Sequence, residues 1–177
     1  MTTLKDLTHD LHVKAEAHPF TQDLLSGNIQ PLPYATLLAN QLVMYTELER
    51  LCVERGLLIG LEGILRKDRI LQDIIELNQP VRILPSTAKF VEHLQTCSDS
   101  QLLAHIYVKH MGDLYGGQIL KSRVPGTGHM YEFDNRSELI AGLRSRLNIE
   151  MANEARNGFQ MTLDLFDEIY KICYNKQ

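Results

Sequence analysis

Apolar residues recur every three or four positions along nearly the whole chain, which is the spacing of amphipathic helices. Pro and Gly clusters interrupt this pattern at HPF (18–20), PLP (31–33), Pro85 and VPGTG (124–128), and we expect helices to stop there. The predicted helices cover residues 4–17, 34–58, 61–77, 86–97, a glycine-bearing stretch capped by Ser98 or Ser100, 136–150 and 151–174. No strand pattern competes with them. The pattern predicts an all-α fold.

The composition narrows the class of protein. A chain of 177 residues, 44% of them hydrophobic, suits a single domain over residues 1–177. A net charge of −4 argues against nucleic acid as the main partner. Three widely spaced cysteines indicate reduced structural thiols. Because the N-terminus lacks an apolar signal core, the C-terminus ends polar in YNKQ and no long apolar run occurs, we expect a soluble, cytoplasmic protein with no membrane partner.

The stretch Tyr107–Leu120, YVKHMGDLYGGQIL, places three glycines inside a predicted helix. Each costs about 1 kcal/mol of helix stability relative to alanine. Gly112 and Gly116 share a helical face, and His105 is expected on that face too. Either another helix packs closely against bare backbone, or a large flat ligand lies on it and the helix bends to receive it. The neighbouring Asp113 favours a ligand, because a carboxylate in a dry contact between helices would need a partner or solvent.

Two segments carry a resemblance to a known family. HIYVKHMGDLYGGQIL (105–120) resembles the distal-helix signature of haem oxygenases, and LKDLTHDLHVKAE (4–16) resembles their proximal-helix signature. YTELERL (45–51), LRSRLNIE (143–150) and FQMTLDLFDEI (159–169) extend the resemblance in family order. It implies a single-domain helical bundle that holds haem between a proximal helix and a glycine-kinked distal helix.

The resemblance assigns His12 as the ligand of the haem iron and Glu16 as the residue that orients its imidazole. Taken alone, His12 would be a core or surface histidine and Glu16 a solvated helix charge. His9, His18 and His105 are competing imidazoles.

On the distal side, the resemblance implies that backbone at Gly112 and Gly116 contacts haem. It also implies that Asp113 holds ordered water that steers dioxygen onto a meso carbon of the ring. Taken alone, Asp113 would be a surface charge. The further matches are Gly117 beside the ligand, Tyr45 and Tyr107 lining the site, Lys5 and Arg144 around the propionates, and Phe159 and Phe166 as aromatic walls. Ordinary core packing explains the aromatic residues equally well.

The chain also departs from the family pattern. Tyr115 stands where a small serine is common, and its phenol either crowds the pocket or points outward. Ile140 replaces a second basic propionate contact, and Lys109 replaces an arginine. The segment 121–143 is short, which predicts a more open distal side.

The function implied is oxidative opening of haem to biliverdin, with release of iron and carbon monoxide. Haem b is both substrate and cofactor, and O2 is the oxidant. The sequence has no nucleotide-binding glycine loop after a strand, so electrons are expected from a ferredoxin or flavin reductase. The alternatives are a haem carrier or sensor that does not turn haem over, and a helical protein of the same shape that acts on another small molecule.

Overall fold

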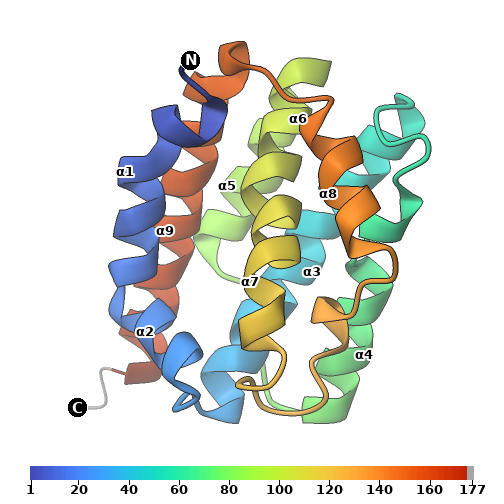
Figure 1. Cartoon of the computed structure of the whole chain (residues 1–177). Helices are drawn as coiled ribbons and strands as arrows, with labels where there is room; N and C mark the ends of the chain where they lie inside the picture. The colour runs from blue at the N-terminus through green and yellow to red at the C-terminus, as the bar shows by residue number, and fades with distance from the viewer. Residues whose placement is uncertain (175–177) are drawn as a thin grey trace.

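The computed structural model describes residues 1–174, and every regular element within them is a helix. The elements are α1 (Leu4–Ala17), α2 (Pro19–Ser26), α3 (Pro31–Glu54), η1 (Glu62–Ile64), α4 (Lys67–Leu77), α5 (Pro85–Leu94), α6 (Asp99–Ile106), η2 (Tyr107–Met111), α7 (Gly112–Leu120), η3 (His129–Tyr131), α8 (Arg136–Arg144), η4 (Ile149–Met151) and α9 (Ala152–Tyr174). They form one helical bundle (Figure 1). The all-α prediction is confirmed. Of the polar C-terminal segment YNKQ, residues 175–177 lie outside the described residues.

The prolines were expected to stop helices, but three of them begin helices instead. Pro19, Pro31 and Pro85 are the first residues of α2, α3 and α5. A proline fits this position because its ring presets a helical φ and the first N–H of a helix has no partner within the helix. The prediction therefore missed α2 and began α3 three residues late.

Several predicted helices also ended too late. α3 stops at Glu54 instead of 58, α5 at Leu94 instead of 97, and α8 at Arg144 instead of 150, while the predicted helix 61–77 divides into η1 and α4. The cause is apolar residues that are buried without being helical. Leu58 and Leu61 are 3% and 4% exposed although they lie in the connection between α3 and η1. Buried apolar residues therefore keep the helical spacing in the sequence beyond the point where the helix ends, and the predicted helices run too long.

Helix α1 lies beside α9, at the left of Figure 1. Thr3 caps α1 through a reciprocal pair of hydrogen bonds with Asp6. Only Leu4 and Thr8 of α1 are buried. On the surface, Arg156 of α9 binds both carboxylate oxygens of Asp10, at 2.6 and 3.0 Å. The first helix is therefore held by a narrow contact along one side, which leaves most of its surface exposed.

The segments α6, η2 and α7 follow one another as a continuous helix along the near side of the bundle (Figure 1). Ser98, one of the two predicted caps, caps this helix through a reciprocal pair of hydrogen bonds with Gln101. Its middle turn, Tyr107–Met111, is a π-helix. Such wide turns are often found at functional sites. Helix α3 packs behind this segment and carries the largest set of buried residues of any helix.

Candidate active site

The glycines of α7 divide into two kinds. Gly112 is exposed and has ordinary helical angles, φ −58° and ψ −44°, so its backbone does not require glycine. A Cβ built on Gly112 would meet no atom within 4 Å, and one on Gly116 would meet only the tip of Leu120 at 3.8 Å. Neither backbone strain nor a packing neighbour among residues 1–174 explains these two glycines. Their missing side chains leave bare helix surface open to a ligand.

Gly117 shows the opposite behaviour. It is buried, and a Cβ there would lie 2.9 Å from Cδ1 and 3.1 Å from Cβ of Tyr131. This glycine is explained by close packing against η3. The packing interpretation therefore applies at Gly117, and the ligand interpretation remains a prediction for Gly112 and Gly116. The surroundings of Gly117 do not support its predicted contact with a ligand.

Asp113 lies beside the bare surface and is 9% exposed. The Tyr45 hydroxyl of α3 donates a hydrogen bond to Oδ2 of Asp113 at 2.6 Å. Burial raises the pKa of Asp113 from 3.8 to about 6, while His110, the Tyr45 hydrogen bond, Arg66 and Lys109 act to lower it. Burial also raises the pKa of Tyr45 well above its ordinary value, so the phenol stays a donor. Oδ1 of Asp113 accepts no hydrogen bond from the described residues.

Lys109 reaches into the core from the π-helical turn and is also 9% exposed. Its ammonium lies 4.7 Å from the ring centre of Phe90 and 5.9 Å from that of Tyr45, within cation–π range. Burial lowers the pKa of Lys109 to about 8, and the charge of Asp113 raises it. The amine thus supplies a poorly solvated positive charge near Asp113.

A buried acid–imidazole pair packs against Tyr45. Nε2 of His110 lies 2.8 Å from Oε2 of Glu49, and both side chains are almost inaccessible to solvent. The Tyr45 and His110 rings are tilted against each other, with centres 4.7 Å apart. We did not select Glu49 or His110 from the sequence. One signal was present: Tyr45 and Glu49 lie four residues apart, so a buried Tyr45 places Glu49 on the same inward face.

His12 lies on the exposed surface of α1, and 56% of its side chain is accessible. Its Nδ1 is 3.8 Å from Oε2 of Glu16, too long for a hydrogen bond but suited to orienting the ring. Phe159 of α9 meets the imidazole edge to face, with ring centres 6.1 Å apart. The structure thus brings together His12, Glu16 and Phe159, and leaves the imidazole accessible to a ligand.

The competing histidines have other surroundings. His9 is exposed one turn before His12. His18 caps α2, and its Nε2 lies 2.8 Å from Asp167. His105 is fully buried, and its Nε2 lies 2.7 Å from Glu154 of α9.

The expected shared face of His105, Gly112 and Gly116 is wrong. The sequence argument assumed regular α-helix from His105 onward, but the π-helical turn lies between them. One extra residue in a turn rotates everything after it by about 100° around the helix axis. His105 therefore points toward α5 and α9, while Gly112 and Gly116 face outward.

The other residues named from the sequence have the following surroundings. The Tyr107 hydroxyl lies 3.2 Å from the Thr8 hydroxyl, which links the distal helix to α1. Lys5 and Arg144 are exposed, and Nη2 of Arg144 donates to the Tyr115 hydroxyl. Tyr115 is 47% exposed, so it points outward instead of crowding the bare helix surface. Ile140 is 9% exposed and belongs to the core.

Phe166 packs against His18 and Phe20, with ring centres 5.7 and 5.2 Å away. This contact belongs to the junction of α2 and α9. A surface cavity of about 400 Å³ lies elsewhere, beside Gly63, Arg66 and Glu132, and contains none of the predicted site residues. We regard the residues around His12 and Gly112 as the candidate site, because they combine an accessible imidazole with bare backbone and a buried acid.

The all-helical fold thus combines bare helix surface and a buried carboxyl group on α7 with an accessible imidazole on α1. The comparisons with known proteins identify the family. A family model described as "Heme oxygenase" matches residues 1–168. Heme oxygenase 1 of Rattus norvegicus is 26% identical over 202 aligned positions, which cover 94% of this chain and 70% of the rat protein.

Two solved structures share the fold. Heme oxygenase-2 of Synechocystis, in complex with heme and NO, aligns with a TM-score of 0.83 at 24% identity and covers 96% of this chain and 84% of its own. Heme oxygenase-1 of Synechocystis, in complex with heme, aligns at 0.81 and 23% identity and covers 94% and 90%. The chain belongs to the heme oxygenase family, whose members are haem-degrading oxidoreductases. Among residues 1–174, no helix has both the length and the apolar character needed to span a membrane.

Proposed function

We propose that this protein binds haem between His12 and the bare backbone of Gly112 and Gly116, and opens it to biliverdin with release of iron and carbon monoxide. One observation carries the proposal: Gly112 lacks a side chain although neither its backbone angles nor any packing neighbour among residues 1–174 requires glycine there. An exposed imidazole on α1 and a buried carboxylate next to Gly112 suit the two faces of a haem. When bound, haem supplies the iron that activates dioxygen and the ring that is opened.

His12 is the proposed axial ligand, through Nε2. Glu16 lies on the Nδ1 side of the ring and favours the tautomer that leaves Nε2 free to ligate. Phe159 limits rotation of the imidazole by contacting its edge. Because most of the imidazole is accessible, ligation needs little rearrangement of α1.

Asp113 is the proposed proton-handling residue. Tyr45 holds Oδ2 and so fixes the plane of the carboxyl group, which leaves Oδ1 to bind water at the bare helix surface. With a pKa of about 6, the carboxyl group can accept and return a proton near neutral pH. Lys109 and His110 lie against the ring of Tyr45, and so support the donor of this hydrogen bond.

Exposed basic residues around the site are proposed to bind the haem propionates. Lys5 and Arg144 carry this role, and Arg144 is already positioned by Tyr115. Electrons are proposed to come from a separate ferredoxin or flavin reductase. The protein is proposed to act in the cytoplasm.

The deciding experiment adds hemin to the purified protein and supplies ascorbate or a reductase system in air, with catalase present. Loss of the Soret band and growth of bilin absorption support the proposal, and an anaerobic sample is the control. A Soret band that persists through reduction in air would instead indicate a haem carrier or sensor. A protein that never develops a Soret band would refute haem binding itself.

A further inference from the structure

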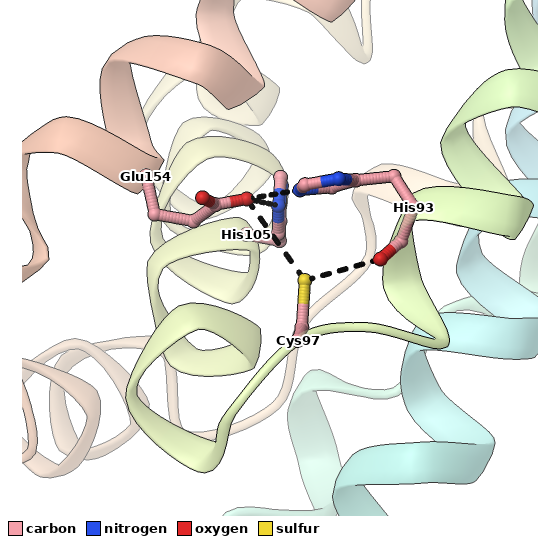
Figure 2. Close-up of side chains that lie close together, drawn as sticks. All are labelled: His93, Cys97, His105 and Glu154. Atoms are coloured by element: carbon pink, nitrogen blue, oxygen red, sulfur yellow. Dashed lines mark hydrogen bonds and ion pairs between the residues drawn. The ribbon is translucent and has the colours of Figure 1, made fainter.

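A second group of metal-binding side chains lies outside the proposed haem site. Its members are His93 of α5, Cys97 in the turn after α5, His105 of α6 and Glu154 of α9 (Figure 2). One ligand atom from each lies within 4.8 Å of all the others. None of the four has a part in the haem chemistry proposed above. We name this group the His93–Glu154 cluster.

The donor atoms of the cluster point at one place. Oε1 of Glu154 lies 2.5 Å from Nε2 of His93, 2.7 Å from Nε2 of His105 and 3.9 Å from Sγ of Cys97. Figure 2 shows the three side chains arranged around this oxygen. Three potential ligands that surround a single anionic oxygen mark a position that favours positive charge.

Most of the cluster is buried, which distinguishes it from a chance grouping of exposed polar side chains. His105 is fully buried, Cys97 is 4% exposed and the Glu154 side chain is 12% exposed. His93 is the most accessible member, with 27% of its side chain exposed, and gives a route from solvent. Buried charges and imidazoles are costly unless they are paired or bind a metal.

The ionisation of the cluster suits a cation. The hydrogen bond from His105 lowers the pKa of Glu154 to about 2, so the carboxylate is ionised. Burial lowers the pKa of His105, and its hydrogen bond to Glu154 acts to raise it. Burial raises the pKa of the Cys97 thiol to about 11, so this group carries a proton until a metal displaces it.

We propose that His93, Cys97, His105 and Glu154 form a zinc site that fastens α5 and α6 to α9. One thiolate, two imidazoles and one carboxylate are a four-ligand set that Zn²⁺ binds tetrahedrally. Thiolate disfavours Mg²⁺ and Ca²⁺, which prefer oxygen ligands. The site is closed, with four protein ligands, so its expected role is structural.

Only a small movement separates the present arrangement from a metal site. Ordinary Zn–N, Zn–O and Zn–S bond lengths place tetrahedral ligand atoms about 3.4–3.8 Å apart. In the cluster, the closest pair is at 2.5 Å and every pair lies within 4.8 Å. Glu154 must therefore withdraw by about 1 Å and Cys97 must approach, with both changes within reach of side-chain rotation.

Binding also rearranges protons in a defined way. The Cys97 thiol, now 3.5 Å from the carbonyl of His93, releases its proton to solvent. Nε2 of His105 becomes a ligand, so its ring proton resides on Nδ1. That nitrogen has no hydrogen-bond partner among the described residues, and it faces Gly158, where a Cβ would lie only 3.0 Å away. The glycine keeps room for the ring at this position.

The test uses Co²⁺ and Zn²⁺ on the full, haem-free chain after treatment with a chelator. Co²⁺ should bind in a 1:1 ratio and show tetrahedral ligand-field bands with thiolate-to-cobalt charge transfer, and Zn²⁺ should displace it. His93→Gln and Cys97→Ala should each weaken binding by more than the roughly 10–100-fold that loss of an outer hydrogen-bond partner causes. Zn²⁺ should raise the thermal midpoint of the unmodified chain but not of these variants.

Matched controls exclude other side chains. Cys173→Ala removes a cysteine outside the cluster, and His129→Gln removes a histidine with the same 27% side-chain exposure as His93. Both should bind Co²⁺ like the unmodified chain. Should Cys97→Ala fail to fold by circular dichroism, the partly exposed His93 variant decides. The proposal is overturned if Co²⁺ shows no charge-transfer band, or if His93→Gln binds Co²⁺ as tightly as the controls. Neither result depends on haem turnover.

Discussion

The two sides of the proposed haem site are built differently. On α1, His12 is more than half exposed, and its nearest acidic partner is 3.8 Å away. On α7, Asp113 is buried, bonded to Tyr45 at 2.6 Å and supported by charged groups from the core. The proximal side is open and loosely held, while the distal side is fixed before any ligand arrives.

We infer from this difference that the proposed chemistry belongs to the rigid side. Groups that move protons act best when they are already positioned, because no reorganisation is then needed during reaction. An axial ligand needs only to reach its metal, and an exposed side chain on a lightly anchored helix can do so with little rearrangement of the protein. We therefore expect substitutions on α1 to change binding, and substitutions near α7 to change folding stability and turnover as well.

The largest effect is expected from His12→Ala. Loss of the imidazole should abolish axial ligation and change the haem spectrum, while folding stability stays within about 0.5 kcal/mol because the side chain is exposed. Absorption spectroscopy with hemin measures the first and urea unfolding the second. His9→Ala, an exposed histidine one turn earlier, is the matched control. An unchanged haem spectrum in His12→Ala would remove this residue as the ligand.

Asp113→Asn should change the folding stability in a way that depends on pH. The rise in the pKa of Asp113 from 3.8 to about 6 means that the folded protein binds this proton more tightly than the unfolded chain. The cost of the buried charge is thus absent below pH about 4, grows as pH rises through 6 and reaches about 3 kcal/mol. Asparagine can still accept the Tyr45 hydrogen bond but is never charged.

The Asp113→Asn variant should therefore be more stable than the unmodified chain by up to about 3 kcal/mol at pH 8, and close to it at pH 4. Urea unfolding at both pH values measures this difference. Haem binding should survive while bilin formation falls sharply. A stability difference that does not change with pH would show that burial of the charge is not the cause.

The glycines of α7 provide a comparison within a single helix. Gly117→Ala should destabilise the protein by about 1–2 kcal/mol, since overpacking against Tyr131 outweighs the gain in helix propensity. Gly112→Ala should stabilise the haem-free protein by up to about 1 kcal/mol and weaken haem binding. Urea unfolding and hemin titration of both variants check these signs. Loss of stability in Gly112→Ala would mean that its bare surface serves packing after all.

The smallest effect is expected from Glu16→Gln. The carboxylate is 57% exposed and does not hydrogen-bond His12, so stability should change by less than about 0.5 kcal/mol. Haem should remain ligated, with a small shift in its spectrum. A resonance Raman measurement of the iron–imidazole stretch would detect the change. Complete loss of ligation would show that Glu16 does more than orient the ring.

The sequence predicted the helical class and offered Ser98 as one of two possible caps, because both depend on local spacing. The roles of His12, Gly112 and Asp113 came from the family resemblance and remain predictions. It missed α2 and misplaced the start of α3, because a proline both ends one helix and begins the next. It also missed Glu49 and His110, whose pairing depends on how two helices pack. The expected shared face of His105, Gly112 and Gly116 failed because apolar periodicity does not reveal a π-helical turn.

The π-helical turn at Tyr107–Met111 has a consequence for insertions and deletions. Deleting Val108, a residue of this turn with no role assigned above, would restore ordinary winding and keep Tyr107, Lys109 and His110. It would also swing Asp113 about 100° away from Tyr45 and turn the bare surface at Gly112 in another direction. The geometry of this site therefore depends on the number of residues between His105 and Gly112 as much as on their identity.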